Sequence, residues 1–376
     1  MNIGFAIAPY QRYSGVGVYY HQLINQIVRL YPGNNYYVYV SAESHADALK
    51  AFPAVNVVPV NVPNGPSWKR ALYTYRYNDV SGHYGPKSLD LLHSFSFPGF
   101  VCRGKNILTV YDMRDEDMPA LNRPLRNYYG RFLKRRTLRK FDLLIAISDF
   151  TRRRLVHHYP EVENKVRVIH LSGGERFAGI AERSGCSKNS ERGQYILAVS
   201  HLMPRKNLAV LIRAYDMLIT RYPLPHRLLI VGRKYENDNA FDRALHSASF
   251  KDRIEIISSL DEEALSGCYR EASLFVHPAV YEGFGIPVLE AASFRIPVLA
   301  SNTSSLPEIL EDPECLFDPL DAEGLCLKMF KSLVDDKFRA RIIDSGQRCL
   351  ARFSWETTAE MTYESYRLKL LTDGEC

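Results

Sequence analysis

The feature that most constrains the fold is an alternation of short apolar runs with stretches of helical periodicity, which occurs twice along the chain. The runs are apolar throughout, a pattern typical of strands in a parallel sheet covered by helices on both faces. They lie at residues 3–8, 36–40, 55–62, 89–93, 107–111, 143–147 and 166–171, and again at 195–199, 228–231, 254–257, 274–276 and 298–300. We therefore predict an α/β fold with two parallel sheets.

A polar, glycine-containing stretch at residues 174–194 separates the two series of runs and predicts a linker. A chain of 376 residues also suits two domains better than one. We predict Rossmann-like domains over residues 1–175 and 195–354, joined by a linker over 176–194. Because ligands of such sheets bind beyond the carboxyl ends of the strands, the turns at those ends are the candidate site.

Composition narrows the class of protein. The first apolar run is too short for a signal peptide, and no later run approaches the roughly eighteen residues that cross a bilayer. With 46% hydrophobic and 24% charged residues, the chain is expected to be globular and cytoplasmic. Its seven cysteines are scattered and form no CxxC or Cys/His cluster, which favours reduced thiols over disulfides or a metal site.

Basic residues concentrate in one segment, RPLRNYYGRFLKRRTLRK at residues 123–140, which contains eight Lys and Arg and no acid. Apolar residues at 125, 128, 129, 132 and 133 add a helical stripe. Such a helix either packs its stripe on the core or docks on an anionic membrane or a lipid-linked acceptor. No nucleic-acid-binding module accompanies it, so a nucleic-acid partner is not expected. The candidate patch consists of Arg126, Arg131, Lys134, Arg135, Arg136, Arg139 and Lys140.

A glycine turn, YQRYSGVGVYY, follows the first apolar run. Gly15 and Gly17 begin a dinucleotide fingerprint, but Tyr20 stands where its third glycine belongs, which disfavours a nicotinamide-dependent dehydrogenase. Two interpretations are open. The turn either presents the amides of a helix N-terminus to an anion or serves only as a structural turn.

Two cations follow the first run of the second series, in SHLMPRKNLAVLI. Arg205 and Lys206 precede an apolar helical repeat, so both can project from the carboxyl end of a strand. A pair of cations there can neutralise a diphosphate, with Arg as a planar fork and Lys as a point charge. A solvated basic turn is the alternative.

Two glutamates flank a glycine turn in HPAVYEGFGIPVLE. Pro287 suits the first position of a helix, and glycines at 283 and 285 let the backbone lie against a ligand. Glu282 precedes the turn while Glu290 lies near the end of the first helical turn, so we expect them to contact different parts of an extended ligand. This separation disfavours a glycosidase, whose two acids converge across one bond.

Together these motifs resemble the retaining glycosyltransferases of family 4, which have the two-domain GT-B architecture. Residues 282–290 match the family's E-x7-E motif, and RKNL at 205–208 matches a second. Further matches lie at residues 14–17, 146–148, 304–308, 317–319 and 353–355, so the resemblance covers essentially the whole chain. The segments SNTSSLPEI and EGFGIPVLE are similar to those of mannosyltransferases in the family.

The resemblance implies a nucleotide-sugar donor held mainly by the C-terminal domain and an acceptor held mainly by the N-terminal one, across a cleft. Glu290 would bind the ribose, and the last helix, about 355–376, would pack back on the N-terminal domain. The implied catalytic residues are Glu282, Arg205 and Lys206. The implied donor-binding residues are Gly15, Gly17, Asp112, Ser148, Gly283, Phe284, Gly285, Ile286, Leu289 and Glu290.

The implied reaction is hexosyl transfer with retention, in which the departing phosphate takes the acceptor's proton and neither a metal nor another cofactor is needed. We expect mannose to pass from GDP-mannose to a lipid-linked saccharide, in lipopolysaccharide O-antigen or exopolysaccharide synthesis at the inner face of the plasma membrane. The alternatives are a UDP-sugar donor (glucose, galactose or GlcNAc), a soluble enzyme that makes a small glycoside, and a non-catalytic GT-B subunit that partners an active transferase.

Three positions depart from the family or imitate another site. Tyr111-Asp112 stands where many relatives have His-Asp, and His93 is a candidate substitute for that histidine. Ser259 replaces a glycine in the expected base-binding turn, with a change of nucleotide preference or no effect as the two outcomes. Residues 115–117, a D-x-D like the metal-binding motif of another glycosyltransferase architecture, are expected to be a solvated surface loop.

Overall fold

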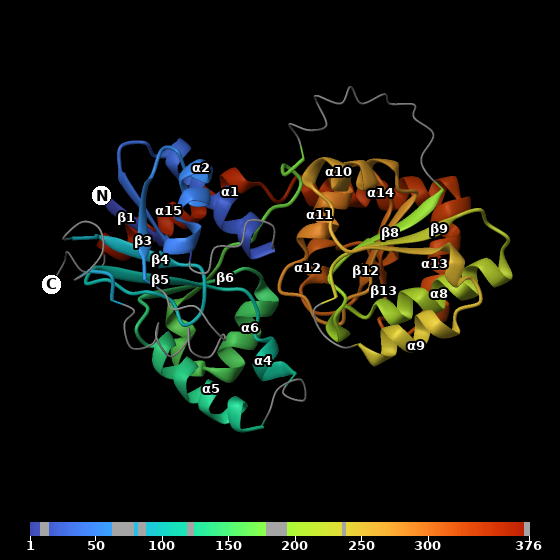
Figure 1. Cartoon of the computed structure of the whole chain (residues 1–376), viewed down its shortest axis with the longest axis horizontal. Helices are drawn as coiled ribbons and strands as arrows, with labels where there is room; N and C mark the ends of the chain where they lie inside the picture. Colours follow the sequence, from blue (N-terminus) through green and yellow to red (C-terminus); the bar gives the residue numbers. More distant parts are fainter. Residues whose placement is uncertain are drawn as a thin grey trace. The chain divides into compact units, whose positions relative to one another are not determined.

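The computed structural model describes residues 1–7, 15–61, 79–81, 88–118, 124–177, 194–234 and 238–371, with the backbone alone for 124–130. The chain divides into two compact units, Met1–Leu171 with Trp355–Cys376, and Ser172–Ser354 (Figure 1). The C-terminal residues therefore belong to the first unit, and residues 172–175, expected in the N-terminal domain, belong to the second. Residues 178–193 of the expected linker lie outside the described part.

The first unit contains a seven-stranded parallel sheet in the order β3-β2-β1-β4-β5-β6-β7. Helices α1, α2 and α15 cover one face, and α5 and α6 cover the other (Figure 1). The strands are β1 (Asn2–Ala6), β2 (Asn35–Ser41), β3 (Asn56–Val60), β4 (Leu91–Ser94), β5 (Lys105–Val110), β6 (Leu143–Ala146) and β7 (Val166–Val168). The helices are α1 (Gly15–Leu30), α2 (His45–Ala51), α4 (Arg114–Asp117), α5 (Pro124–Leu138), α6 (Asp149–His158) and α15 (Trp355–Leu371).

The second unit contains a six-stranded parallel sheet in the order β10-β9-β8-β11-β12-β13. Helices α8, α9 and α13 lie on one face, and α10, α11 and α14 on the other (Figure 1). The strands are β8 (Tyr195–Val199), β9 (Arg227–Val231), β10 (Ile254–Ile257), β11 (Leu274–His277), β12 (Val298–Ser301) and β13 (Leu316–Phe317). The helices are α8 (Leu208–Arg221), α9 (Asn239–Ser247), α10 (Glu262–Glu271), α11 (Ile286–Ser293), α12 (Leu306–Ile309), α13 (Ala322–Val334) and α14 (Asp336–Leu350).

Both sheets follow from the apolar runs. Strands β4, β6, β11 and β12 are buried along their whole length, as expected when helices cover both faces. Helix α1 buries Tyr19, Leu23, Ile24 and Ile27 at helical spacing. The prediction of an α/β fold with two parallel sheets is confirmed. Among the described residues, no helix combines the length and the apolar character needed to cross a membrane.

A buried histidine ties α15 to the first sheet. His93 Nδ1 in β4 lies 2.6 Å from the Tyr366 hydroxyl of α15, and Nε2 lies 2.8 Å from Thr109 Oγ1 of β5. Burial lowers the pKa of His93 to about 3, so the ring is neutral. Both ring nitrogens are engaged inside the core, so the suggestion that His93 substitutes for the family's donor-facing histidine is wrong.

Replacing Tyr366 by Phe should lower the free energy of unfolding of the first unit by about 1–3 kcal/mol, because one buried nitrogen of His93 loses its partner. The measurement is urea unfolding followed by tryptophan fluorescence, to which Trp355 of α15 contributes. The matched control is Tyr37→Phe in β2, at a half-buried position. Equal losses in the two variants would contradict this role for Tyr366.

Candidate active site

Two loops of the second unit bring Arg205, Lys206 and Glu282 together. One loop follows β8, and the other runs from the end of β11 to α11, and these strands are neighbours in the sheet. Lys206 Nζ donates a short hydrogen bond to Glu282 Oε2. Arg205 Nη1 lies 3.3 Å from the same oxygen and donates to the Tyr281 carbonyl oxygen at 3.1 Å. We call these three residues the cation–carboxylate cluster.

Electrostatics keep this cluster charged. Burial alone would raise the pKa of the Glu282 carboxyl, but Lys206 and Arg205 hold that pKa well below its usual range. Lys206 is only 7% exposed, so its ammonium depends on Glu282 as a counter-charge. Two cations against one carboxylate leave one net positive charge at the carboxyl edge of the sheet, where an anion can be neutralised.

Polar atoms without a partner lie beside the cluster. In the part of the chain that the structure describes, Arg205 Nε and both ring nitrogens of His277 are buried and make no hydrogen bond. His277 Nε2 is 3.8 Å from Glu282 Oε2, which is too long for a hydrogen bond, and burial lowers its pKa. A buried polar group without a partner lowers stability by about 1–3 kcal/mol. A ligand whose oxygen accepts a hydrogen bond from such a group would relieve this cost.

Two serines and a glycine shape the loop that carries Glu282. The Glu282 amide donates to Ser304 Oγ at 3.1 Å, and the Ser305 hydroxyl lies 2.9 and 2.7 Å from the carbonyl oxygens of Glu282 and Phe284. Gly285 has φ 121°, and a Cβ there would lie 2.9 Å from Leu306 Cδ2. The sequence marked Ser304 and Ser305 only as family matches and gave them no role.

The second glutamate has its own partners. Glu290 in α11 is 2% exposed, and Arg176 Nη1 donates to its Oε1 at 2.7 Å. The Tyr269 hydroxyl of α10 donates to Oε2 at 2.8 Å. The sequence predicted a role for neither Arg176, which is the first residue of the expected linker, nor Tyr269. No motif or spacing indicated them, because both partners are distant from Glu290 along the chain.

Three other predicted donor-binding residues of the second unit have buried side chains. Phe284 is buried, and its ring packs edge-on against Phe353 at 5.6 Å between centroids. Leu289 is fully buried in α11, and Ile286 begins that helix. Their side chains therefore belong to the core, and contact with a ligand is left to the amides of residues 283–286. That contact stays a prediction.

Of the predicted donor-binding residues in the first unit, Gly15 and Gly17 lie within the first turn of α1, while residues 8–14 are outside the described part. Ser148 is fully buried and caps α6, accepting from the Thr151 amide at 3.0 Å. Asp112 follows β5, is partly exposed and accepts from the Arg114 amide at 3.2 Å. Of these four, Asp112 is among the residues that line a cavity.

That cavity lies at the carboxyl end of β5 and has a volume of about 280 Å³. Its polar and aromatic lining residues include Phe97, Tyr111, Asp112, Asp115 and Lys134. Among the described residues, the Tyr111 hydroxyl is buried without a hydrogen-bond partner. A pocket with carboxylates and aromatic rings suits a hydroxyl-rich ligand.

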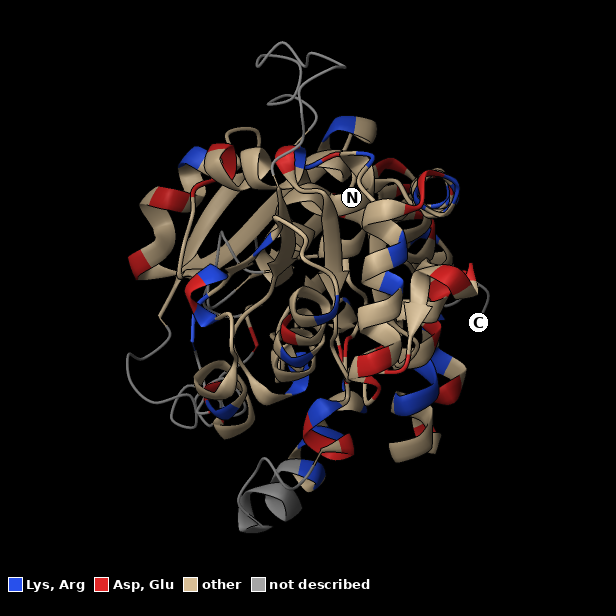
Figure 2. Ribbon diagram, turned by 90° about the vertical axis from the view of Figure 1, so that its right-hand side faces the viewer, with Lys and Arg blue, Asp and Glu red and all other residues tan. Residues whose placement is uncertain are grey.

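The expectation of a solvated loop holds for Asp115, which is exposed, and is wrong for Glu116 and Asp117, whose carboxylates are buried. Glu116 is 6% exposed and binds Lys134 Nζ at 2.8 Å and the Tyr159 hydroxyl at 3.0 Å. Asp117 binds Arg154 and, at 2.6 Å, His158. These acids lie in α4 and attach α5 and α6 to one another (Figure 2 colours the charged residues).

The basic helix α5 does not bury its expected stripe where side chains are described. Phe132 is 61% exposed and Leu133 is partly exposed, whereas Thr137 and Leu138 are buried. Lys134 faces inward because Glu116 binds it, which turns the apolar residues outward. Among the other residues of the basic patch, Arg131 donates to the Glu116 carbonyl oxygen, and Arg135 and Arg139 lie 2.7 and 4.0 Å from Glu161. Arg136 and Lys140 are exposed, and the side chain of Arg126 is not described.

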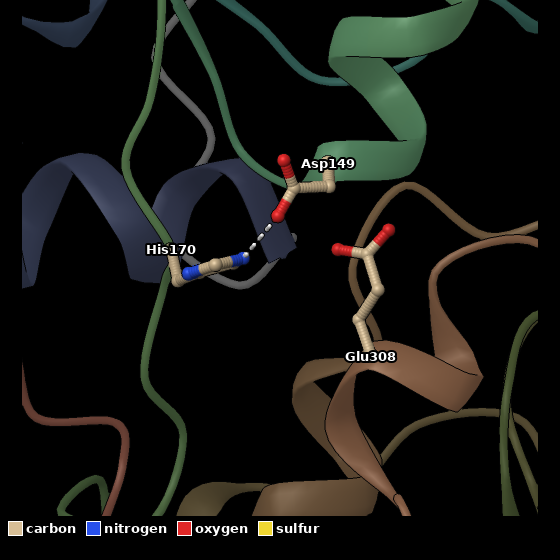
Figure 3. Close-up of side chains that lie close together, drawn as sticks. All are labelled: Asp149, His170 and Glu308. Atoms are coloured by element: carbon tan, nitrogen blue, oxygen red, sulfur yellow. Dashed lines mark ion pairs between the residues drawn. The ribbon is translucent and has the colours of Figure 1, made fainter.

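Asp149 and His170 form an ion pair in the first unit, with Oδ2 and Nε2 3.8 Å apart (Figure 3). Glu308, drawn in the same view, belongs to the second unit. Two side chains are fewer than the three or four protein ligands of a typical zinc site. That the reaction needs no metal stays a prediction.

Two family models match the chain. Residues 13–171 match the model described as Glycosyltransferase Family 4, and residues 183–348 match Glycosyl transferases group 1. Together the two models span most of the chain. The chain belongs to the glycosyltransferases.

Curated relatives of this glycosyltransferase include three bacterial mannosyltransferases. O-antigen chain mannosyltransferase B from Escherichia coli is 28% identical over 60% of this chain and 60% of its own length. Serotype-specific mannosyltransferase WbdA from Escherichia coli is 28% identical over 75% of this chain and 36% of its length. O-antigen chain mannosyltransferase RfbU from Salmonella typhimurium is 24% identical over 86% and 88%. The match thus spans less than two thirds of the first two relatives.

Solved structures support the fold of this glycosyltransferase. Sucrose-phosphate synthase from Thermosynechococcus elongatus superposes with a TM-score of 0.72 at 17% identity, covering 99% of this chain and 100% of that one. WaaG, a glycosyltransferase involved in lipopolysaccharide biosynthesis, gives 0.70 at 16% identity over 96% and 98%. The predicted GT-B fold class is confirmed.

Replacing Glu282 by Gln should destabilise the second unit by about 3 kcal/mol at neutral pH, because buried Lys206 loses its counter-charge. The stabilising effect of a carboxyl with a depressed folded pKa is complete above its unfolded value of 4.5 and is lost as the pH falls below that value. The wild type should therefore approach the variant as the pH drops. Hydrogen exchange of β11 and α11 measures this difference.

The double variant Lys206→Met/Glu282→Gln should regain part of the loss, because it removes the unpaired charge as well. Equal protection of β11 and α11 from hydrogen exchange in wild type and in Glu282→Gln at pH 7 would contradict a charged pair of Lys206 and Glu282.

Proposed function

We propose that this glycosyltransferase transfers a hexose with retention from a nucleotide sugar, with GDP-mannose as the first candidate, to a lipid-linked saccharide in O-antigen or exopolysaccharide synthesis. The mannosyltransferase relatives support the sugar and the process. The observation that carries the proposal is the cation–carboxylate cluster, which presents two cations fixed by one largely buried carboxylate at the carboxyl edge of a parallel sheet, where ligands of such sheets bind.

In this proposal the cluster binds the diphosphate of the donor. Glu282 holds Arg205 and Lys206 in place before the ligand arrives, so little reorganisation is needed when negative charge develops on the leaving group. Arg205 Nε, buried without a partner among the described residues, supplies a donor for a phosphate oxygen. The amides of residues 283–286, ahead of α11, add the favourable end of a helix dipole.

The same geometry assigns Glu282 a second task. Its described contacts gather on Oε2, so the other oxygen, Oε1, is proposed to accept a hydrogen bond from a hydroxyl of the donor sugar. During transfer the bond between C1 and the diphosphate oxygen breaks, and the acceptor oxygen bonds to C1 on the same face. The acceptor's proton passes to a diphosphate oxygen, which completes the nucleoside diphosphate without a side-chain nucleophile or a metal.

We propose the cavity beside β5 as the acceptor subsite. Phe97 and Tyr111 are aromatic residues of its lining against which a sugar ring can pack, and the carboxylates of Asp112 and Asp115 can accept hydrogen bonds from the sugar's hydroxyls. Tyr111 then replaces the family histidine as a hydrogen-bond donor, consistent with its unpartnered hydroxyl among the described residues.

We further propose that α5 holds the enzyme at the inner face of the plasma membrane as a peripheral protein. Phe132 and Leu133 are exposed beside the basic residues Arg131, Arg135 and Arg136. An apolar side chain flanked by cations is the combination that binds anionic lipid surfaces. The enzyme would meet a lipid-linked acceptor at that surface.

Transfer should be measured with GDP-mannose and a synthetic lipid-linked saccharide, in EDTA, with the anomeric configuration of the product read by NMR. We expect a product of retained configuration, and Arg205→Met should lower kcat by about 10²- to 10³-fold. The matched control, Arg213→Met on the exposed face of α8, should keep wild-type activity.

Turnover with a UDP-sugar and not with GDP-mannose would change the proposed donor, but the proposed role of the cation–carboxylate cluster would remain. An inverted product would contradict the proposed chemistry. No hydrolysis or transfer with any nucleotide sugar, from a folded sample, would overturn the proposed function.

Sedimentation with vesicles containing phosphatidylglycerol tests the membrane proposal. Wild type should sediment, and the double variant Phe132→Ser/Arg136→Glu should stay in the supernatant, because it removes an exposed apolar contact and reverses an exposed charge. Lys337→Glu on α14, also an exposed charge reversal, is the control and should sediment. A wild type that ignores anionic vesicles would contradict the docking role of α5.

A further inference from the structure

Arg176 and Tyr269, which we call the Glu290 clamp, hold both oxygens of a buried carboxylate. Arg176 Nη1 donates to Oε1 at 2.7 Å, and the Tyr269 hydroxyl donates to Oε2 at 2.8 Å. A carboxylate accepts about four hydrogen bonds, so each oxygen keeps one acceptor position after the clamp has bound. Glu290 is thereby fixed in orientation and still able to accept two more bonds.

The clamp is itself rigid. Arg176 also lies 3.3 Å from Glu262, and its guanidinium lies over the Phe177 ring at 5.0 Å from the centroid. Tyr269 is fully buried and packs against Phe177, Phe275 and Phe294, with ring centroids 5.6–5.8 Å apart. Neither residue can follow a displaced carboxylate without disturbing this packing.

Charge explains why an arginine stands here. Glu290 is almost fully buried, and an ionised carboxylate at such a position needs a paired cation and further hydrogen bonds. Arg176, itself largely buried, supplies the cation, and burial against the attraction of Glu290 leaves the pKa of its guanidinium raised. Removing Arg176 would leave the buried carboxylate without its paired cation and with one oxygen no longer held.

We propose that Arg176 and Tyr269 are positioning residues that align the ionised Glu290 carboxylate to accept hydrogen bonds from the two ribose hydroxyls of the donor. The inference rests on the proposed function, because the resemblance alone gives Glu290 its ribose contact. Two charge-assisted hydrogen bonds from neighbouring hydroxyls require a fixed orientation of both carboxylate oxygens, which the clamp supplies by binding each of them. Selectivity for ribonucleotides would then depend on residues that do not touch the nucleotide.

The experiment compares GDP with 2′,3′-dideoxy-GDP by isothermal titration calorimetry on the full-length protein. Wild type should prefer GDP by at least about tenfold, since two hydrogen bonds to a charged group are lost with the deoxy sugar. Arg176→Met and Tyr269→Phe should each reduce this preference severalfold while the affinity for dideoxy-GDP stays near wild type. Arg176→Lys should keep part of the preference for GDP, because lysine retains the positive charge but lacks the planar set of donors of the guanidinium.

Two controls separate positioning from stability. Glu262→Gln removes the other carboxylate that binds Arg176 and should keep the full preference. An unchanged affinity for dideoxy-GDP shows that the variants are folded. If Arg176→Met loses that affinity, Tyr269→Phe, which deletes one hydroxyl from the buried ring, decides the test.

Glu290→Gln separates the positioning role of Arg176 and Tyr269 from the ribose contact of Glu290 itself. If Glu290→Gln abolishes the preference while Arg176→Met and Tyr269→Phe keep it, the positioning inference is overturned and the proposed ribose contact stands. If wild type has no preference, or Glu290→Gln keeps it, the ribose contact of the proposed function is overturned together with the inference. The uridine pair replaces the guanosine pair if wild type binds only UDP, and binding of neither nucleotide overturns the proposed function.

Discussion

The structure of the site depends on the rule that a buried carboxylate must be paired with a cation. Glu282 cannot remain ionised in its loop without Lys206 and Arg205, and Lys206 cannot remain charged at its depth without Glu282. This mutual dependence joins the loop after β8 to the loop after β11, which the order of the parallel sheet makes neighbours. The loops are further fixed by Ser304, Ser305 and the positive-φ glycine at 285. A preformed electropositive position at the sheet edge follows from that arrangement.

The same rule applies a second time to Glu290, with different partners. Arg176 and Tyr269 hold it within the second unit, so the two glutamates of the E-x7-E motif are fixed independently. Helix α11 thus connects two separately stabilised carboxylates, one beside the cations proposed to bind phosphate and one proposed to bind ribose. A motif of two glutamates therefore needs at least four further residues to become a site, and the motif itself contains none of them.

Features carried by local spacing could be predicted from the sequence. The apolar runs located twelve of the thirteen strands of the described chain, and the exception, β13, is two residues long.

Residue spacing does not predict contacts between side chains that are far apart along the chain. Arg176 and Glu290 are 114 positions apart, and no periodicity connects them. In α5 the apolar stripe predicted an inward face, yet the Lys134–Glu116 pair sets which side is buried, and Phe132 points outward. Burial of Glu116 and Asp117 was missed for the same reason, because their partners in α5 and α6 are not adjacent in sequence.

We assign binding of the donor diphosphate to Arg205 and Lys206, without a metal. The decisive measurement is calorimetric titration of GDP and of GMP in EDTA, on wild type and on Lys206→Met. Wild type should bind GDP at least about tenfold more tightly than GMP, since the second phosphate gains charge-assisted bonds, and Lys206→Met should bind the two nearly equally. Equal binding of GDP and GMP by the wild type, or a diphosphate preference that survives in Lys206→Met, would contradict this assignment.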